Sequence, residues 1–390
     1  MIVAAMLAMV ATGANAKSAT DSATIAKNKP VFTVVKQNPI TSIKDQNRSG
    51  TCWAYSTLSY FESEILKHTG KTYDLSEMFV ANKTYMDRAT MAVRMHGDVS
   101  FSQGGSAYDV LYALQHYGIV PEGAMPAPGT LTGDSLANFG EFFDVMTPYV
   151  EAVAKSNAKK ISSAWKSGLQ GIIDSYIGKT PEKFTYQGKQ YTPQSFCQSL
   201  GLNLDDYVTI TSYTHHPMWS KFAVEVQDNW RWPLSYNVPM DDLCKIIDNA
   251  INNGYTVAWG GDVTEDGFTR KGLGIAYDVK KVRSMAGTDA DHWFKLSKDE
   301  KKEKFDSLGV NAPEVVPTQA MRQEAFDNWE TTDDHGMHIY GIAKDQNGKE
   351  YYMVKNSWGE YGDYKGTWYM TKAFVAYKTM DFMVNKNAIP

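Results

Sequence analysis

A cysteine at the start of a predicted helix is the first residue in the sequence with the chemistry of a nucleophile. Cys52 follows the turn "QNRSGT" and opens the stretch Cys52–Lys67, whose apolar residues recur at spacings of four, three and four. This spacing predicts an amphipathic helix, and Gly70 supplies a stop signal after its last turn. Because unpaired backbone N–H groups and the helix dipole favour negative charge at a helix N-terminus, the position predicts a thiolate at Cys52.

A glutamine on the turn before this helix has the chemistry of an oxyanion ligand. Gln46 stands six residues before Cys52. Its side-chain amide can direct an N–H toward the same point as the backbone N–H of Cys52, which is how an oxyanion hole is assembled. This placement favours a nucleophile over the alternative, in which Cys52 is simply a packed helix residue.

A general base for this nucleophile is expected near the other end of the chain. The stretches 337–343 and 350–358 have the pattern of two strands joined at Asn347-Gly348, which predicts a hairpin. The hairpin brings His335 toward Asn356, with a longer loop or a bulge needed to put them in step. An Asn carbonyl then orients the imidazole, and Trp358 shields their hydrogen bond from water. His338 is the competing base, but it lies on the opposite face of the strand.

Taken together, "QNRSGTCWAYS", "HGM" and "KNSWG" resemble the motifs of papain-like cysteine peptidases, in the same order along the chain. The resemblance implies an α+β fold of two lobes, with the cleft between a helical lobe and a β-rich lobe. It implies that Cys52 is the nucleophile, His335 the acid and base, Asn356 the orienting residue and Gln46 an oxyanion ligand.

The resemblance also implies a set of substrate-binding residues. The run "SQGGSAYDVLYALQHYGIVPE" is similar to the Gly-Gly substrate loop of the family, where bare backbone pairs with the peptide. An ordinary turn is the alternative for such a pair taken alone. The residues assigned to substrate binding are Gly104, Gly105, Asp334, Gly336 and Trp358.

The length of the chain points to one branch of this family. A minimal papain-like fold needs little more than half of 390 residues, and the surplus forms an insertion at about 127–240, expected on the helical side. The arrangement resembles the bleomycin hydrolase and aminopeptidase C branch, which implies an aminopeptidase, peptide substrates and a homo-oligomer, a hexamer in that branch. It also implies that the C-terminal arm ending at Pro390 lies in the cleft and meets the free amine of the substrate. An endopeptidase of the same fold is the alternative.

Composition limits the other function classes. The net charge of -5 argues against a nucleic-acid partner, and no zinc-ligand spacing, Walker loop or dinucleotide fingerprint occurs, so no cofactor or metal is expected. Three cysteines are too few for a disulfide framework. Cys197 and Cys244 either pair with each other or serve as small buried hydrophobes.

The first sixteen residues, "MIVAAMLAMVATGANA", are uncharged and end in a small-x-small pattern, which is typical of a signal peptide. Residues 17–390 are then the peptidase domain of an exported, periplasmic or extracellular protein, with no membrane partner after cleavage. A buried apolar N-terminal helix is the alternative, and it would return the protein to the cytoplasm, as in most of the branch.

Two rival functions come from other classes. A Cys-His acyltransferase of transglutaminase type shares the nucleophile and base, but it does not require Gln46 before the nucleophile or the run "NSWG". An inactive peptide-binding homologue normally lacks the nucleophile or the base, and this chain has both. The residues therefore favour a cysteine peptidase.

Overall fold

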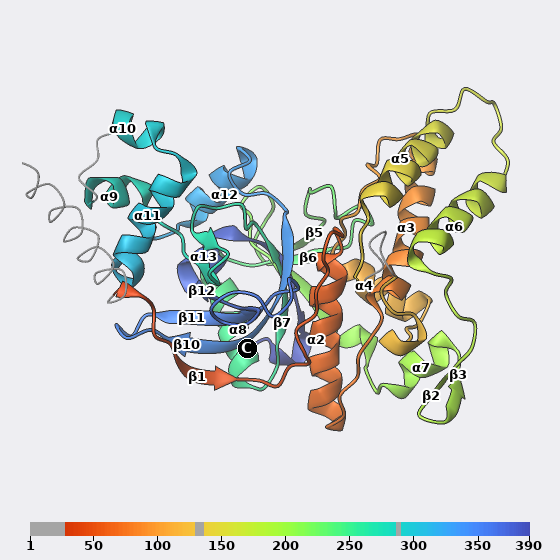
Figure 1. The fold of residues 1–390 in the computed structure, drawn as a ribbon, viewed down its shortest axis with the longest axis horizontal. Helices are drawn as coiled ribbons and strands as arrows, with labels where there is room; N and C mark the ends of the chain where they lie inside the picture. Colours follow the sequence, from red (N-terminus) through yellow and green to blue (C-terminus); the bar gives the residue numbers. More distant parts are fainter. Residues whose placement is uncertain (1–27, 129–135, 286–289) are drawn as a thin grey trace, which may run out of the picture.

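The computed structural model describes residues 28–128, 136–285 and 290–390. In this part of the chain a group of helices stands beside a large mixed sheet, as Figure 1 shows. The two parts have separate hydrophobic cores, one among the helices and one between the sheet and the helices that cover it. The expected α+β fold with two lobes is confirmed.

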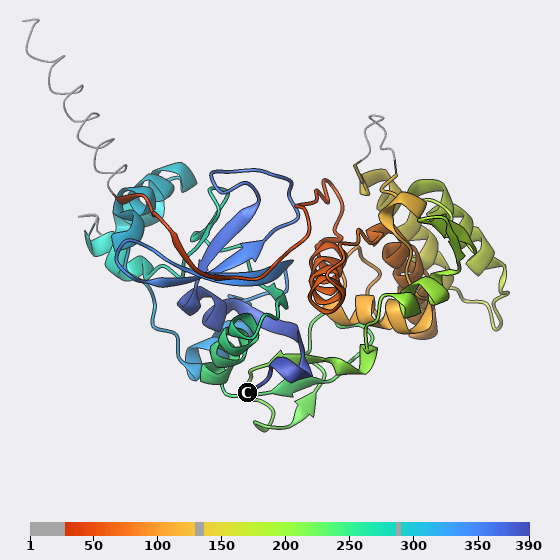
Figure 2. The same cartoon turned by 90° about the horizontal axis from the view of Figure 1, so that it is seen from below.

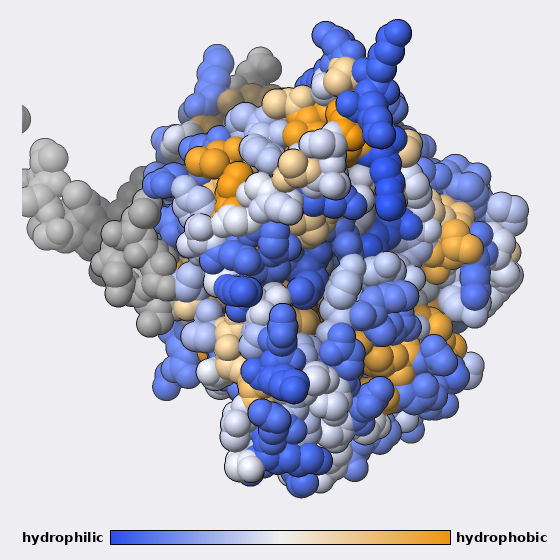
Figure 3. Space-filling model, turned by 90° about the vertical axis from the view of Figure 1, so that its right-hand side faces the viewer, coloured by the Kyte–Doolittle hydropathy of each residue, from blue (hydrophilic) through white to orange (hydrophobic). Residues whose placement is uncertain are grey.

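The helical lobe is built around three helices of the first third of the chain and three later ones that pack on them. They are α2 (Cys52–Thr69), α3 (Glu77–Arg94), α4 (Ala107–His116), α5 (Gly140–Ala154), α6 (Ala164–Ile177) and α7 (Pro193–Ser199). α5 and α6 contact α3, and the small hairpin of β2 (Phe184–Tyr186) and β3 (Lys189–Tyr191) lies beside α7. Hydrophilic residues cover most of the outer face of this lobe, with apolar ones in small separate groups (Figure 3).

The sheet of the second lobe has the order β5-β6-β4-β13-β7-β10-β11-β12-β9-β8, and β1 pairs with β10 off this path. Its strands are β1 (Thr33–Gln37), β4 (Tyr207–Thr211), β5 (Lys221–Phe222), β6 (Ser235–Asn237), β7 (Val257–Gly261), β8 (Phe268–Thr269), β9 (Leu273–Gly274), β10 (His335–Lys344), β11 (Glu350–Lys355), β12 (Thr367–Thr371) and β13 (Thr379–Asn385). The later part of the insertion at about 127–240 contributes β4, β5 and β6. It therefore extends the sheet, whereas the whole insertion was expected on the helical side.

Helices of the second half of the chain accompany this sheet. They are α8 (Met240–Asn252), α9 (Val279–Met285), α10 (Ala290–Lys295), α11 (Lys298–Leu308), α12 (Gln319–Asp327) and α13 (Lys372–Lys378). α8 and α13 pack on each other and supply apolar side chains to the sheet core. Among the described residues, no helix has the length and hydropathy that crossing a bilayer requires.

The predicted hairpin is confirmed as β10 and β11. Gly348 at its turn has a φ of 81°, a conformation that favours glycine, and the loop closes with a hydrogen bond from the Asp345 N–H to the Lys349 carbonyl. The register shifts by one residue between Ile339 and Gly341. This is the bulge that the spacing of the two motifs requires.

The helix that begins at Cys52 stands between the two lobes, and it is seen end-on in Figure 2. Its C-terminal end has the expected glycine, since Gly70 has a φ of 68° and its N–H donates to the Leu66 carbonyl. Toward the sheet, Ser59 Oγ lies 2.9 Å from His338 Nδ1, and Glu64 accepts a hydrogen bond from Asn385. α2 therefore belongs to the core of one lobe while it contacts strands of the other.

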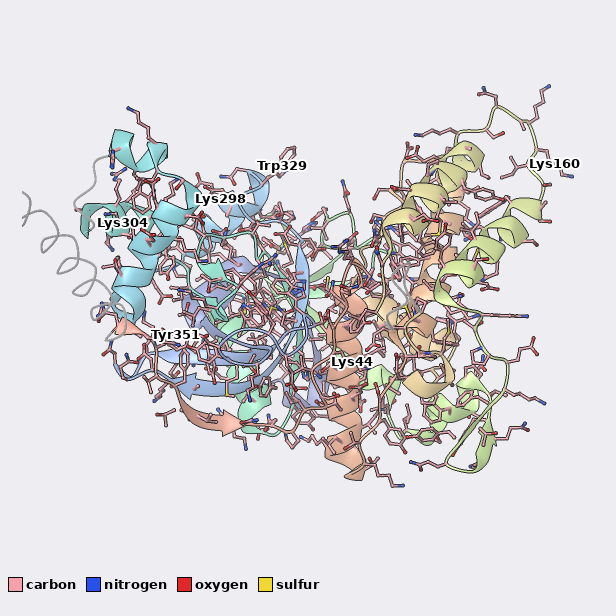
Figure 4. The ribbon with its side chains drawn as sticks, in the orientation of Figure 1. Lys44, Lys160, Lys298, Lys304, Trp329 and Tyr351 are labelled. Carbon is pink, nitrogen blue, oxygen red and sulfur yellow. The ribbon has the colours of Figure 1, made fainter. Side chains whose placement is uncertain are left out.

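A charged side chain before α2 anchors this helix to its neighbour. Lys44, labelled beside α2 in Figure 4, lies 3.5 Å from Glu62 of α2 and 2.8 Å from Glu77 of α3. Asp74 completes the group at 2.6 Å. Because both glutamates are buried, their charges need this lysine, and the segment before Cys52 is held in place by it.

A glycine permits the close contact of α2 with β10. A Cβ atom at Gly336 would lie 2.7 Å from Ser56 Oγ and 3.3 Å from the Cys52 carbonyl oxygen. The first distance is shorter than any normal contact of a side chain. Gly336 therefore sets how near the strand that begins at His335 comes to the helix that begins at Cys52.

We predict that Gly336→Ala lowers the free energy of unfolding by about 1–3 kcal/mol, because the added methyl group overpacks the interface. Urea unfolding measures this change. The double variant Gly336→Ala, Ser56→Ala removes the nearest atom and should recover part of the loss. Equal stability of the single variant and the unmodified protein would contradict this account of the interface.

Candidate active site

The residues predicted to act as nucleophile and base line one cavity between the lobes. This cavity of about 170 Å³ includes Cys52 from α2, His335 and Gly336 from β10, and both Gly104 and Gly105. The remaining walls come from β7, β13 and the segment 224–229. The structure therefore brings together residues that lie almost three hundred positions apart in the sequence.

The hydrogen bonds of Asn356 fix the orientation of His335. His335 Nε2 lies 2.8 Å from Asn356 Oδ1, and the backbone N–H of Ser357 donates to the same oxygen at 2.8 Å. Because that oxygen only accepts, Nε2 carries the proton of the neutral imidazole. Nδ1 is then the free basic atom, and it can take a proton from Cys52.

An aromatic ring covers this pair on one side. The ring centres of Trp358 and His335 are 4.9 Å apart, with an angle of 33° between the planes. Trp358 is held in turn by an edge contact with Trp368 at 5.4 Å. His335 and Asn356 are both buried, so their hydrogen bond is protected from exchange with water.

Burial acts against charge on both reacting groups. It raises the pKa of the Cys52 thiol to about 12, and the carboxylates of Asp333 and Asp228 raise it further, although backbone N–H groups of Gly336 and Trp53 oppose the shift. It lowers the pKa of His335 to about 4. Desolvation therefore opposes the thiolate that the helix terminus favours at Cys52, and it opposes the imidazolium form of His335.

Gln46 is held by the strand end that carries Asn356. Its Oε1 accepts a 2.6 Å hydrogen bond from Ser357 Oγ, and its backbone N–H donates to the Ser357 carbonyl. Its Nε2 donates one hydrogen to the Ser49 carbonyl at 2.7 Å, which leaves the other hydrogen of the amide for an oxyanion. Ser357 thus contacts both Asn356 and Gln46, two of the predicted site residues, which its place within "KNSWG" did not reveal.

A buried arginine holds the Gly-Gly loop in place through hydrogen bonds. Arg88 Nη1 donates to the Gly104 carbonyl at 2.6 Å and to Asp228 at 3.0 Å. The Gly104 carbonyl is therefore used within the protein. A Cβ at Gly104 would lie 1.8 Å from Asp228, and a Cβ at Gly105 would lie 2.9 Å from Trp53, so both positions require glycine.

His338, the competing base, lies behind the cleft. It is fully buried, and its partner is Ser59 of α2. It lines a second, smaller cavity together with Lys355 and Asn356, but it does not line the cavity of Cys52. The strand therefore directs His335 and not His338 toward the thiol.

Four carboxyl groups contribute to the wall of the Cys52 cavity. One of them, Asp334, belongs to the predicted set, and partial desolvation and the neighbouring Asp262 raise its pKa to about 6. Asp228, Asp333 and Asp381 were not predicted. Only Asp333 could have been found from the sequence, because it stands beside Asp334 directly before His335. Asp228 and Asp381 come from distant segments.

The expectation that the C-terminal arm lies in the cleft is wrong. Thr379–Asn385 form β13, which pairs with β4 on one side and β7 on the other. The turn that follows packs on α8, where Asn249 donates to the Ala388 carbonyl, and no residue of 386–390 lines the cavity. The last segment is held by the sheet, because six of the seven residues of β13 are buried, and the chain after Met380 is therefore not a free arm.

The remaining candidate ligands and thiols lie outside the cleft. His215, His216 and Glu225 hold their ligand atoms within 4.8 Å of one another, but hydrogen bonds from both rings to the carboxylate account for this exposed group. All three cysteines are free. Cys197 and Cys244 do not pair, because they belong to the cores of different lobes.

Comparison with known proteins agrees with this geometry. The sequence pattern of the peptidase C1-like family matches residues 3–390. The chain belongs to this family. Among similar members are aminopeptidase G of Lactobacillus delbrueckii subsp. lactis, 23% identical over 89% of this chain and 82% of its own, and aminopeptidase C of Lactobacillus helveticus, 24% identical over 92% and 84%. These relatives place the chain in the aminopeptidase C branch of the papain-like peptidases.

A solved structure has a similar fold. PepW from Lactobacillus rhamnosis HN001 superimposes with a TM-score of 0.70 over 98% of this chain and 90% of its own, at 20% sequence identity. At this identity the likeness concerns the fold. Roles of individual residues in the present protein rest on the contacts described above.

The lowered pKa of His335 predicts the acid limit of activity. As the pH falls through about 4, Nδ1 gains a proton and can no longer accept one from Cys52, so kcat/KM should decline with a midpoint near pH 4. The hydrogen bond to Asn356 raises this pKa. Asn356→Ala should therefore move the midpoint to lower pH while it reduces the maximal rate. A midpoint near pH 6.5 in the unmodified protein would contradict the burial of the base.

Proposed function

We propose that this protein is a cysteine peptidase that removes residues from the N-terminus of peptides. The observation that carries the catalytic part is the hydrogen bond of His335 to Asn356, which leaves Nδ1 free in the cavity that also contains Cys52. The relatives named as aminopeptidases support the exopeptidase part. An endopeptidase of the same fold is the alternative. Cleavage of substrates with free and with blocked N-termini distinguishes the two.

The mechanism follows from the positions of these groups. Cys52 Sγ attacks the scissile carbonyl carbon while its proton moves to His335 Nδ1. The carbonyl oxygen becomes an oxyanion, stabilised by the backbone N–H of Cys52 and by the second amide hydrogen of Gln46. His335 gives the proton to the leaving amine, which leaves a thioester. Water then attacks the thioester, with His335 as base, and releases the acid and the free thiol.

Cleavage of matched substrates tests the function directly. We expect the protein to hydrolyse an aminoacyl amide of a fluorescent amine, such as leucyl aminomethylcoumarin, at least tenfold faster than its N-acetylated counterpart. Cys52→Ala should abolish both reactions. Equal rates for free and blocked substrates would support the endopeptidase, and ammonia release from glutamine without peptide cleavage would support an acyltransferase.

The oxyanion role of Gln46 gives a separate prediction. Gln46→Ala should reduce kcat about a hundred- to thousandfold with a much smaller change in KM, because the lost donor acts mainly on the transition state. Ser357→Ala, which frees the Gln46 side chain without removing it, should cause a smaller loss. Steady-state kinetics measure both variants, and near-full activity of Gln46→Ala would contradict the role.

The location of the protein is a further part of the proposal. The pattern of residues 1–16 supports export and cleavage after Ala16, with Lys17 as the new N-terminus. N-terminal sequencing of the protein isolated from its own cells tests this, and an intact N-terminus in the cytoplasm would contradict it. Assembly into a homo-oligomer, a hexamer by resemblance, is tested by light scattering on the same sample.

A further inference from the structure

The cavity beside Cys52 has an acidic wall that catalysis does not use. Asp228, Asp333 and Asp381, here called the acidic wall, come from the segment 224–229, from the residues before β10 and from β13. Asp334 adds a fourth carboxyl group at the rim. Peptide hydrolysis by a thiol and an imidazole needs none of these groups, so their position calls for another explanation.

The charge of this wall is only partly balanced by the protein. Asp228 pairs with Arg88 at 3.0 Å. In the ranges that the structure describes, neither Asp333 nor Asp381 takes part in a salt bridge, and Asp381 has only a long hydrogen bond of 3.4 Å from Ser235. Burial and the neighbouring carboxylates raise the pKa of Asp333 well above its usual range, and burial raises the pKa of Asp381 to about 6. Ionising these carboxyl groups together is therefore unfavourable, and a cation from outside the protein would stabilise their charged forms.

Apolar residues line the same cavity next to the acidic wall. Val224, Val226 and Met380 lie among its lining residues, together with Ala258 and Trp259 of β7. A ligand that fits such a wall carries a positive group and an apolar body. The volume of about 170 Å³ is below the roughly 300 Å³ at which sites for small-molecule ligands begin, so it suits one residue of a larger substrate.

We propose that the acidic wall binds a primary ammonium group that the substrate carries beside its scissile bond. This inference rests on the proposed function, because the substrate is taken to be a peptide held at Cys52. The ammonium group comes either from the free N-terminus or from a lysine side chain near the cleaved bond. In the first case the wall performs the task that the C-terminal carboxylate was expected to perform.

The C-terminal segment supports this assignment through a different residue. The C-terminal end of β13 lies outside the cleft, but the strand places Asp381 in the cleft wall. Asp381 pairs in register with Gly260 of β7. Both residues line the cavity. A side-chain carboxylate on a strand is a more rigid anchor than the end of a flexible arm, because β13 pairs with β7 at Asp381 and with β4 from Phe382 onward.

Isosteric variants test the wall without changing its shape. We expect Asp333→Asn and Asp381→Asn each to lower the ratio of kcat/KM for leucyl aminomethylcoumarin to that for its N-acetylated counterpart by about 10- to 100-fold, the range for a hydrogen bond to a charged group. Asp205→Asn is the matched control. It removes the same charge from an exposed residue outside the cavity, and it should leave the ratio unchanged.

N-terminally blocked peptides distinguish the two sources of the ammonium group. Two N-acetylated peptides, one with Lys and one with norleucine near the cleaved bond, differ only in the side-chain amine. A loss confined to the lysine peptide in Asp333→Asn or Asp381→Asn would assign the wall to a side chain. Equal losses for free, blocked, lysine and norleucine substrates would overturn the proposal, because the two residues would then act on folding or on the catalytic groups.

Binding to the inactive protein tests the wall independently of turnover. Cys52→Ala protein should bind leucinamide and lysinamide in titration calorimetry, and it should bind N-acetyl-leucinamide at least tenfold more weakly. Adding Asp333→Asn should remove this difference. If the unmodified protein cleaved no peptide but this difference remained, the proposed function would fail while the ammonium site stood. Equal affinity for amine and acetylated ligands in both assays would overturn the site.

Discussion

The contact between α2 and β10 is the constraint on which the rest of the molecule depends. The nucleophile begins a helix of one lobe and the base begins a strand of the other, so their separation is set by how closely these elements pack. Gly336 allows that approach, because any side chain there would collide with Ser56. Hydrogen bonds farther along α2, between Ser59 and His338 and from Asn385 to Glu64, also tie the helix to the sheet.

The sequence was most informative where chemistry and local structure coincide. Cys52 stands at a helix start because of the apolar spacing that follows it, and the Asn-Gly turn forces β10 and β11 into a hairpin that delivers His335 to Asn356. Both features arise from interactions over a few residues, which local patterns describe well. The order of Gln46, Cys52, His335 and Asn356 along the chain indicated the family. The family in turn indicated the fold that brings the helix and the hairpin together.

The sequence was least informative where distant segments meet. Asp228, Asp333 and Asp381 converge on one cavity only after β13 has inserted between β4 and β7, and no spacing in the chain foretells that insertion. The prediction for the C-terminal arm was wrong for the same reason, because the sequence of a short strand does not indicate which strands it pairs with. The desolvation of Cys52 was also not foreseen, because the helix terminus is a local effect whereas desolvation depends on the segments that enclose the cavity.

The acidic wall connects the specificity of this site with the activation of its nucleophile. Burial and the carboxylates of Asp228, Asp381 and Asp334 raise the pKa of Asp333 well above its usual range, and any negative charge on Asp333 or Asp228 in turn raises the pKa of the Cys52 thiol. An ammonium group bound against the wall would offset that charge at the moment when the scissile carbonyl reaches the sulfur. Proton transfer to His335 would then be easiest with the correct substrate in place, because the ligand itself removes part of the electrostatic obstacle. Such an arrangement would couple the reactivity of the thiol to the binding of a peptide with a suitably placed amine.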